Sequence, residues 1–166
     1  MVVLAWFGED IGAMIGLIDR ALALNPSFAR GWYLSGLLRI WAGQSDRAIE
    51  DMQTSLRLSP RGRMGQPLTV MGLAYFFEGK FDEAAAKLLL FIHDDPGFLT
   101  SYRALAACYA HMGRLEEARA IVAQLRTITS EIVPSNLVYR NAEHRELFLS
   151  RLRLAADETG INQKKG

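Results

Sequence analysis

Residues 32–60 read WYLSGLLRIWAGQSDRAIEDMQTSLRLSP, and the spacing of small residues in this stretch recurs twice further along the chain. A glycine followed five residues later by an alanine occurs at Gly43 and Ala48, at Gly79 and Ala84, and at Gly113 and Ala118. Similarity at a fixed period indicates stacked copies of one structural unit. The stretch therefore predicts a repeat architecture in which each copy packs on its neighbours.

Each small residue has a physical reason within a pair of antiparallel helices. Trp32 and Gly36, four residues apart, lie on one face of a first helix, where the glycine lets the second helix approach closely. Gly43 suits the left-handed position that ends a helix. Ala48 is small because two helices cross there, and Pro60 ends the second helix.

The period identifies a family resemblance. Gly79 and Gly113 are 34 residues apart, while Gly43 and Gly79 are 36 apart, with the two extra residues in the loop at 61–65. A period near 34 with this large–small–small–Ala–Pro spacing resembles the tetratricopeptide repeat (TPR) over about residues 29–130. The resemblance implies an all-α fold, an α-solenoid of antiparallel helix pairs with about three and a half repeats and a C-terminal capping helix.

The repeat register predicts a division of the chain into segments. Asp10–Pro26 matches only the second helix of a repeat, and Asn141 is a candidate N-cap for a last helix from Ala142 to about Asp157. The predicted segments are an incomplete N-terminal repeat (1–26), three repeats (27–62, 63–98 and 99–130), a linker with the capping helix (131–158) and a flexible tail (159–166).

The N-terminal edge of this predicted solenoid is apolar. A terminal repeat needs a polar outer face, because an uncapped end exposes apolar surface. This chain begins instead with an apolar stretch that contains Val2, Val3, Leu4, Trp6 and Phe7. We expect the chain to be a fragment that lacks N-terminal repeats; the alternative is an edge covered by another subunit in a homo-oligomer.

Composition excludes several functional classes. The 166 residues include 19 Lys and Arg against 18 Asp and Glu, which does not indicate a nucleic-acid or anionic-membrane surface. The longest uncharged run, residues 64–77, is shorter than the roughly 20 residues of a membrane-spanning helix. The N-terminus lacks the basic region of a secretory signal, and Cys108 is alone. We expect a cytoplasmic protein that binds neither nucleic acid nor membrane.

No set of residues indicates catalysis, a metal or a cofactor. His93, His111 and His144 are not at zinc-ligand spacing with each other or with the lone cysteine. No phosphate-binding glycine loop occurs. Acidic pairs recur at equivalent repeat positions, as expected for solvated helix surfaces. The chain is therefore predicted not to be an enzyme and to need no cofactor.

The first helices of a TPR stack line its concave surface, which is the expected site for a partner. By register this surface is apolar and aromatic, and the predicted partner-binding residues are Tyr33, Leu37, Ile40, Trp41, Thr69, Leu73, Phe76, Phe77, Arg103 and His111. Tyr33 and Leu37 stand where the carboxylate clamp of chaperone-binding repeats needs Lys and Asn. We therefore do not expect this surface to capture the acidic C-terminus of a peptide. An open apolar groove indicates a partner. An external protein or peptide, the C-terminal helix and a second copy of the chain remain alternative occupants.

A narrower resemblance comes from the two ends of the chain. The run DRALALNP at 19–26, Trp32, SNLVYR at 135–140 and ELFLSRLRLAA at 146–156 resemble the C-terminal TPR regions of bacterial class III adenylate cyclase-type regulators. The Arg-Pro-Glu-Asp that commonly precedes the last helix there is Arg-Asn-Ala-Glu here. The chain has none of the cyclase metal carboxylates. The resemblance implies the non-catalytic, partner-binding part of a bacterial signalling regulator.

Overall fold

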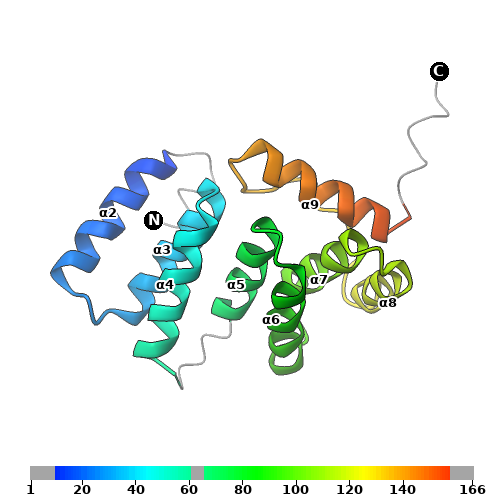
Figure 1. Ribbon diagram of the computed structural model, residues 1–166, viewed down its shortest axis with the longest axis horizontal. Helices are drawn as coiled ribbons and strands as arrows, with labels where there is room; N and C mark the ends of the chain where they lie inside the picture. The colour runs from blue at the N-terminus through cyan, green and yellow to red at the C-terminus, as the bar shows by residue number, and fades with distance from the viewer. Residues whose placement is uncertain (1–9, 61–65, 158–166) are drawn as a thin grey trace.

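The computed structural model describes residues 10–60 and 66–157 of the chain, and every regular element in these ranges is an α-helix. The helices stand in a row and pack as antiparallel pairs, which confirms the all-α solenoid (Figure 1). Their bounds are α2 (Ile11–Leu24), α3 (Ala29–Ala42), α4 (Ser45–Leu58), α5 (Gln66–Phe77), α6 (Phe81–Asp94), α7 (Leu99–His111), α8 (Leu115–Arg126) and α9 (Ala142–Ala155).

The helix pairs α3–α4 and α5–α6 are held by close approach at a glycine. A Cβ placed on Gly36 would lie 2.6 Å from Met52 Cε and 3.1 Å from the Ala48 carbonyl oxygen. A Cβ on Gly72 would lie 2.6 Å from Leu88 Cγ. Both distances are shorter than carbon–carbon contact allows, so the second helix of each pair can sit this close only against glycine. The predicted role of Gly36 is therefore confirmed.

The turns between paired helices also follow the sequence. Gly43, Gly79 and Gly113 have φ angles of +83°, +74° and +75°, in the left-handed region that favours glycine. At the end of α3, the Gln44 amide donates to the Arg39 carbonyl at 2.8 Å. This backbone bond satisfies a carbonyl that the helix leaves unpaired at its end.

The N-terminal helix α2 is joined to the first full pair by a partly buried ion network. Asp10 caps α2, with its carboxylate accepting from the Gly12 amide at 2.8 Å. Arg39, which is 7% exposed, donates to Asp51 at 2.9 Å and to Asp19 of α2 at 2.6 Å. Burial nevertheless raises the pKa of Asp51 above its usual value, because desolvation outweighs the favourable effects of Ser35 and Arg39. The predicted apolar edge at residues 2–7 lies outside the described residues.

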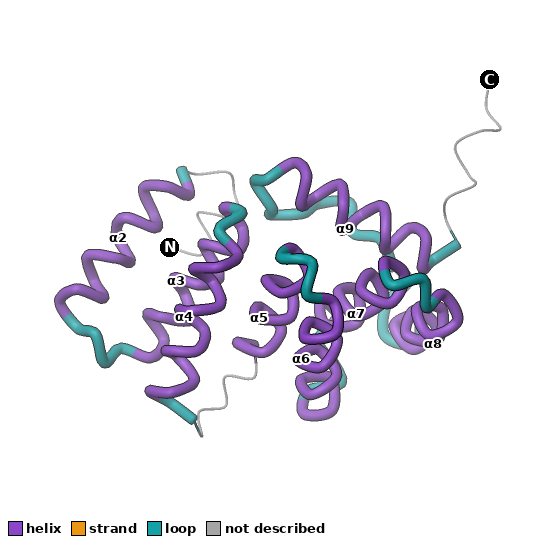
Figure 2. Tube along the Cα trace, in the orientation of Figure 1, coloured by secondary structure: helices purple, strands orange, loops and turns teal. Residues whose placement is uncertain are grey.

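The C-terminal helix α9 lies against α7 and α8, across one side of the row, and its expected N-cap is confirmed (Figure 1). Asn141 accepts from the Glu143 amide at 2.9 Å and from the His144 amide at 3.1 Å. The helix ends at Ala155, slightly before the predicted end. Figure 2 shows the loop that precedes α9 running back beside that helix before the chain turns into it.

Each predicted repeat contains one helix pair: α3–α4 in 27–62, α5–α6 in 63–98 and α7–α8 in 99–130. The exact division into segments stays a prediction. None of the helices in the described ranges has the length and apolar character required to cross a membrane.

Gly72 offers a test of the close approach. We expect Gly72→Ala to lower the free energy of unfolding by about 1–2 kcal/mol, because crowding of the buried Leu88 outweighs the better helix propensity of alanine. Gly16 in α2 is the matched control, since nothing lies within 4 Å of a Cβ there. Gly16→Ala should stabilise the protein by about 0.5–1 kcal/mol. Urea unfolding measures both, and equal effects of the two substitutions would contradict the packing argument.

Candidate functional site

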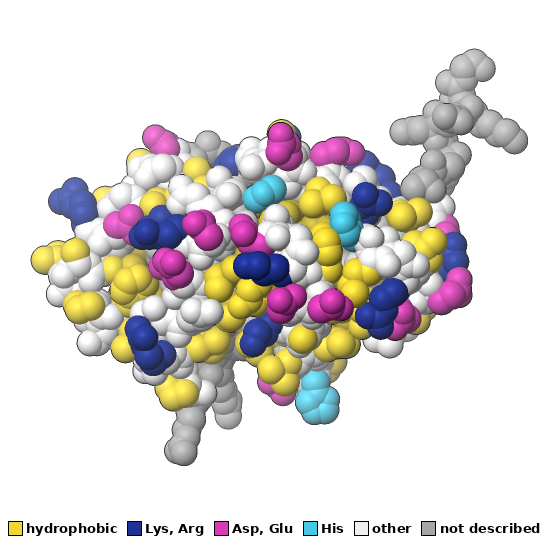
Figure 3. Space-filling model, viewed as in Figure 1, with side chains coloured by type: hydrophobic (Ala, Val, Ile, Leu, Met, Phe, Trp, Pro, Cys, Tyr) yellow, Lys and Arg dark blue, Asp and Glu magenta, His cyan; other side chains and the backbone are white. Residues whose placement is uncertain are grey.

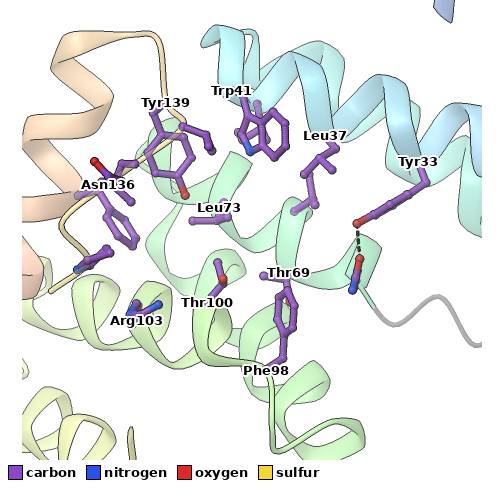
Figure 4. Close-up of a pocket in the computed structure, with 17 residues that line it drawn as sticks. Tyr33, Leu37, Trp41, Thr69, Leu73, Phe98, Thr100, Arg103, Asn136 and Tyr139 are labelled. Atoms are coloured by element: carbon purple, nitrogen blue, oxygen red, sulfur yellow. Dashed lines mark hydrogen bonds between the residues drawn. The ribbon is translucent and has the colours of Figure 1, made fainter. Parts of the chain in front are cut away.

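The first helices of the three pairs line a cavity of about 360 Å³. It contains seven of the ten residues that the sequence predicts for partner binding, drawn in Figure 4 with the rest of the lining: Tyr33, Leu37, Ile40, Trp41, Thr69, Leu73 and Arg103. They come from α3, α5 and the first turns of α7. Residues up to 70 positions apart in the sequence therefore share one apolar concavity.

The remaining wall of the cavity comes from the C-terminal part of the chain. The loop before α9 contributes Pro134, Asn136, Leu137, Val138 and Tyr139, and α9 itself contributes Phe148. Figure 4 shows Tyr139 and Asn136 facing Trp41 and Leu73 across the cavity. The C-terminal helix was one of the alternative occupants expected from the sequence, whereas the loop was not predicted, because no repeat period relates it to the concave surface.

Few polar groups interrupt the apolar lining. The Tyr33 hydroxyl donates to Gln66 Oε1, drawn as a dashed line in Figure 4. Burial raises the pKa of Tyr33, although the nearby Arg30 opposes this effect, so the phenol is neutral at physiological pH. Thr69 Oγ1 and Ser101 Oγ are hydrogen-bonded at 2.7 Å. These pairs satisfy polar atoms that would otherwise be costly to bury.

The Arg103 side chain binds backbone carbonyl groups of the C-terminal loop. Its Nε donates to the Ile132 carbonyl at 2.9 Å and its Nη2 donates to the Glu131 carbonyl at 2.6 Å. Partial burial lowers the pKa of Arg103, while Glu131 opposes the shift, and the guanidinium remains charged. Charge-assisted hydrogen bonds are stronger than neutral ones, so Arg103 is a principal anchor of this loop.

Phe76, Phe77 and His111 do not line the cavity, which corrects their predicted position on an open groove. Phe76 is 0% exposed and makes edge-to-face contacts with Phe77, Phe81 and Phe148. The Phe77 ring is stacked on His144 of α9 at 4.3 Å. The His111 ring is stacked on Phe81 at 4.0 Å. The C-terminal helix covers Phe76 and Phe77, because its Phe148 and His144 pack against these two rings.

The same helix and its preceding loop are tied to the first repeat. Tyr139 is buried between Phe77 and Phe148, with ring centroids 5.2 Å and 5.7 Å away, and burial raises the pKa of its phenol well above the usual value. The Arg140 amide donates to the Trp41 carbonyl at 2.7 Å. The concave surface is thus covered at one end and open at the cavity.

The lone cysteine does not line the cavity. Burial raises the pKa of the Cys108 thiol to about 12, so it is protonated and packed in the core. Among residues 10–60 and 66–157, no group of three or more His, Cys, Asp or Glu side chains is placed to hold a metal ion. On the face seen in Figure 3, acidic and basic side chains are intermixed.

Comparisons with known proteins agree on the repeat. Residues 75–129 match the family model of the tetratricopeptide repeat. No curated protein matches the chain. None of the comparisons links the chain to adenylate cyclase-type regulators.

Solved structures with the same fold are similar over most of the chain. A crystal structure of MamA has a TM-score of 0.67 at 18% identity, covering 90% of this chain and 88% of that chain. The crystal structure of YrrB, described as a TPR protein with an unusual peptide-binding site, has a TM-score of 0.63 at 20% identity, covering 96% and 83%. At such identities the similarity shows the fold, a TPR-like solenoid.

The two histidines at the α9 interface predict a dependence of stability on pH. His111 Nδ1 and His144 Nδ1 are buried and lack a hydrogen-bond partner in the described part of the chain. Desolvation lowers the pKa of both below 6.5; Arg151 adds to the shift of His111, while Glu143 and Glu78 oppose that of His144. Below about pH 6.5 the unfolded chain therefore binds more protons than the folded one. The free energy of unfolding consequently decreases as the pH is lowered.

The corresponding experiment is urea unfolding at several pH values between about 7.5 and 5. We expect His144→Phe, which keeps a ring against Phe77 but cannot be protonated, to lose less stability than the wild type as the pH falls. His93 is exposed near the end of α6, so His93→Phe is the matched control. A pH profile of His144→Phe that is parallel to the wild-type profile would contradict the role of His144.

Proposed function

We propose that this chain is a non-catalytic protein–protein interaction module that binds a partner peptide or helix in the apolar cavity of its concave surface. The observation that carries the proposal is the cavity itself, formed by side chains of α3, α5 and α7 together. Its 360 Å³ lies within the roughly 300–1,000 Å³ of ligand pockets. It also far exceeds the about 10–15 Å³ that one water molecule needs.

The lining supports an apolar occupant. Leu37, Trp41 and Leu73 provide apolar surface, whereas the polar pairs Tyr33–Gln66 and Thr69–Ser101 are already satisfied within the protein. A side chain that enters the cavity gains hydrophobic burial without having to break an ion pair. An extended peptide or an amphipathic helix carries such anchoring side chains at regular spacing.

The family match and the fold support this class of function, since solenoids present extended concave binding surfaces. The YrrB description names a peptide-binding site for that protein. We propose that this chain likewise binds a peptide. A place in a bacterial signalling regulator rests on the resemblance of the chain ends and is likewise a proposal.

Filling the cavity tests the proposal. Peptides selected from a random phage-displayed library against the wild-type protein serve as the probes. Leu37→Trp places a larger side chain in the cavity, and we expect it to weaken these peptides by about tenfold or more, since one excluded apolar side chain is worth ~1.5–3 kcal/mol.

Leu90→Trp makes the same kind of substitution at a residue of α6 that is 52% exposed and does not line the cavity. This control variant should bind the peptides as the wild type does. Circular dichroism checks that both variants keep their helices. Peptides that bind Leu37→Trp with unchanged affinity would contradict the cavity as the docking site.

Self-association through the N-terminal edge is a second candidate, favoured by exposed leucines on α2. Leu17 is 56% exposed and Leu24 is 89% exposed. Apolar side chains at the end of a solenoid can pack against a second copy. Light scattering at micromolar concentration should then give a dimer or larger species that Leu17→Glu together with Leu24→Glu dissociates. A wild-type monomer under these conditions would contradict this function.

A further inference from the structure

The loop at residues 131–140 lies against the concave surface in the manner of a bound peptide. It has no helix of its own, contacts α3, α5 and α7, and forms one wall of the cavity. We propose that residues 131–140 are an intramolecular ligand of the groove and that a partner peptide binds by displacing them. The proposal rests on the proposed function in that the concave surface is the binding surface.

Backbone atoms of this segment make polar contacts with α7 and α3. Arg103 donates to the carbonyl oxygens of Glu131 and Ile132, and the Arg140 amide donates to the Trp41 carbonyl at 2.7 Å. The contacts lie at the two ends of the segment. Arg103 of α7 binds its first two residues, and the Trp41 carbonyl of α3 binds its last residue. Every extended peptide carries the same backbone groups. The groove can therefore make these contacts with a partner of different sequence.

Two buried side chains anchor the segment, Ile132 near its start and Tyr139 near its end. Ile132 is 5% exposed and Tyr139 is 4% exposed, whereas Ser135 and Asn136 are exposed and Leu137 and Val138 are half-buried. The Tyr139 ring lies between Phe77 of α5 and Phe148 of α9. An apolar and an aromatic anchor, with backbone contacts at both ends of the segment, form an arrangement that the side chains of a partner peptide can reproduce.

Displacement would join the two parts of the predicted groove. The segment separates the cavity, lined by Leu37, Trp41 and Leu73, from Phe77, which packs against Tyr139 on the other side. Removal of the Tyr139 ring therefore uncovers the side of Phe77 that this ring contacts, while His144 of α9 stays stacked on the Phe77 ring. The apolar surface of the cavity is thereby extended towards Phe77.

Covalent linkage explains why the segment occupies the groove in the isolated chain. A peptide tethered by a short linker has an effective concentration of the order of millimolar. A free peptide with equal contacts must compete against that concentration. Its apparent affinity for the wild-type protein is therefore much weaker than its affinity for a groove whose own segment has been released.

The test uses a fluorescein-labelled synthetic peptide with the sequence of residues 131–140, EIVPSNLVYR, as the probe. It is titrated into the full-length wild-type chain and the Tyr139→Ser variant. The variant weakens the resident segment while the probe keeps its tyrosine, so we expect at least about tenfold tighter binding to the variant. Tyr75→Ser removes a half-buried tyrosine that does not line the cavity and should leave the probe affinity unchanged.

Hydrogen exchange gives a second measurement that needs no variant. With saturating probe on the wild-type protein, exchange of the resident amides at 131–140 should become faster, because Arg140 loses its bond to Trp41. A probe that binds while this exchange stays unchanged or slows would overturn displacement. Equal probe affinities for wild type and Tyr139→Ser, with helicity retained, would do the same.

The outcomes also separate the two proposals. Probe binding that Tyr139→Ser tightens but Leu37→Trp leaves unchanged would support displacement and overturn the cavity as the docking site. Selected peptides that Leu37→Trp weakens but Tyr139→Ser leaves unchanged would support the cavity and overturn displacement.

Discussion

The contact between paired helices at glycine is the constraint on which the rest of the structure depends. A Cβ at Gly36 would lie 3.1 Å from the Ala48 carbonyl oxygen, and a Cβ at Gly72 would lie 2.6 Å from Leu88 Cγ, so a larger residue at either position would crowd the facing helix. Close pairing leaves the first helix of each pair free to turn its other face towards the next repeat. The glycine contact occurs in α3 and α5, whereas α7 contains no glycine. Side chains of α3, α5 and α7 together line the cavity.

The C-terminal part of the chain then decides how much of that surface is available. Helix α9 packs Phe148 against Phe76 and stacks His144 on Phe77, as expected of a cap that covers the apolar end of a solenoid. The preceding loop adds Tyr139 and the backbone bonds to Arg103 and Trp41. Capping and the proposed partner binding would consequently use adjoining parts of one groove. A change in the position of the loop would alter the size of the proposed binding surface without moving the repeats.

Some of the site residues could be predicted from the sequence and others could not. Tyr33, Leu37, Ile40 and Trp41 were predicted from helical register and lie together in the cavity, because register on one helix is a local property. Phe76 and Phe77 satisfy the same register but are covered, since the sequence does not show which apolar face α9 chooses. Arg103 was expected to contact a partner, whereas the structure shows its guanidinium holding Glu131 and Ile132. Arg39 carried no sequence signal, although it joins Asp19 and Asp51 across three helices.

The sequence by itself determined the helix pairs, their turns and their caps. Gly43, Gly79 and Gly113 adopt left-handed angles and Asn141 caps α9, because each of these features depends on residues only a few positions apart. The tertiary structure alone decided the route of residues 131–140 and the division of the groove. The contact between Trp41 and Arg140 joins positions 99 residues apart, and Arg103 reaches 29 residues ahead to Ile132. No periodic pattern encodes such pairings, since they depend on which of several apolar surfaces buries the most area once the helices are assembled.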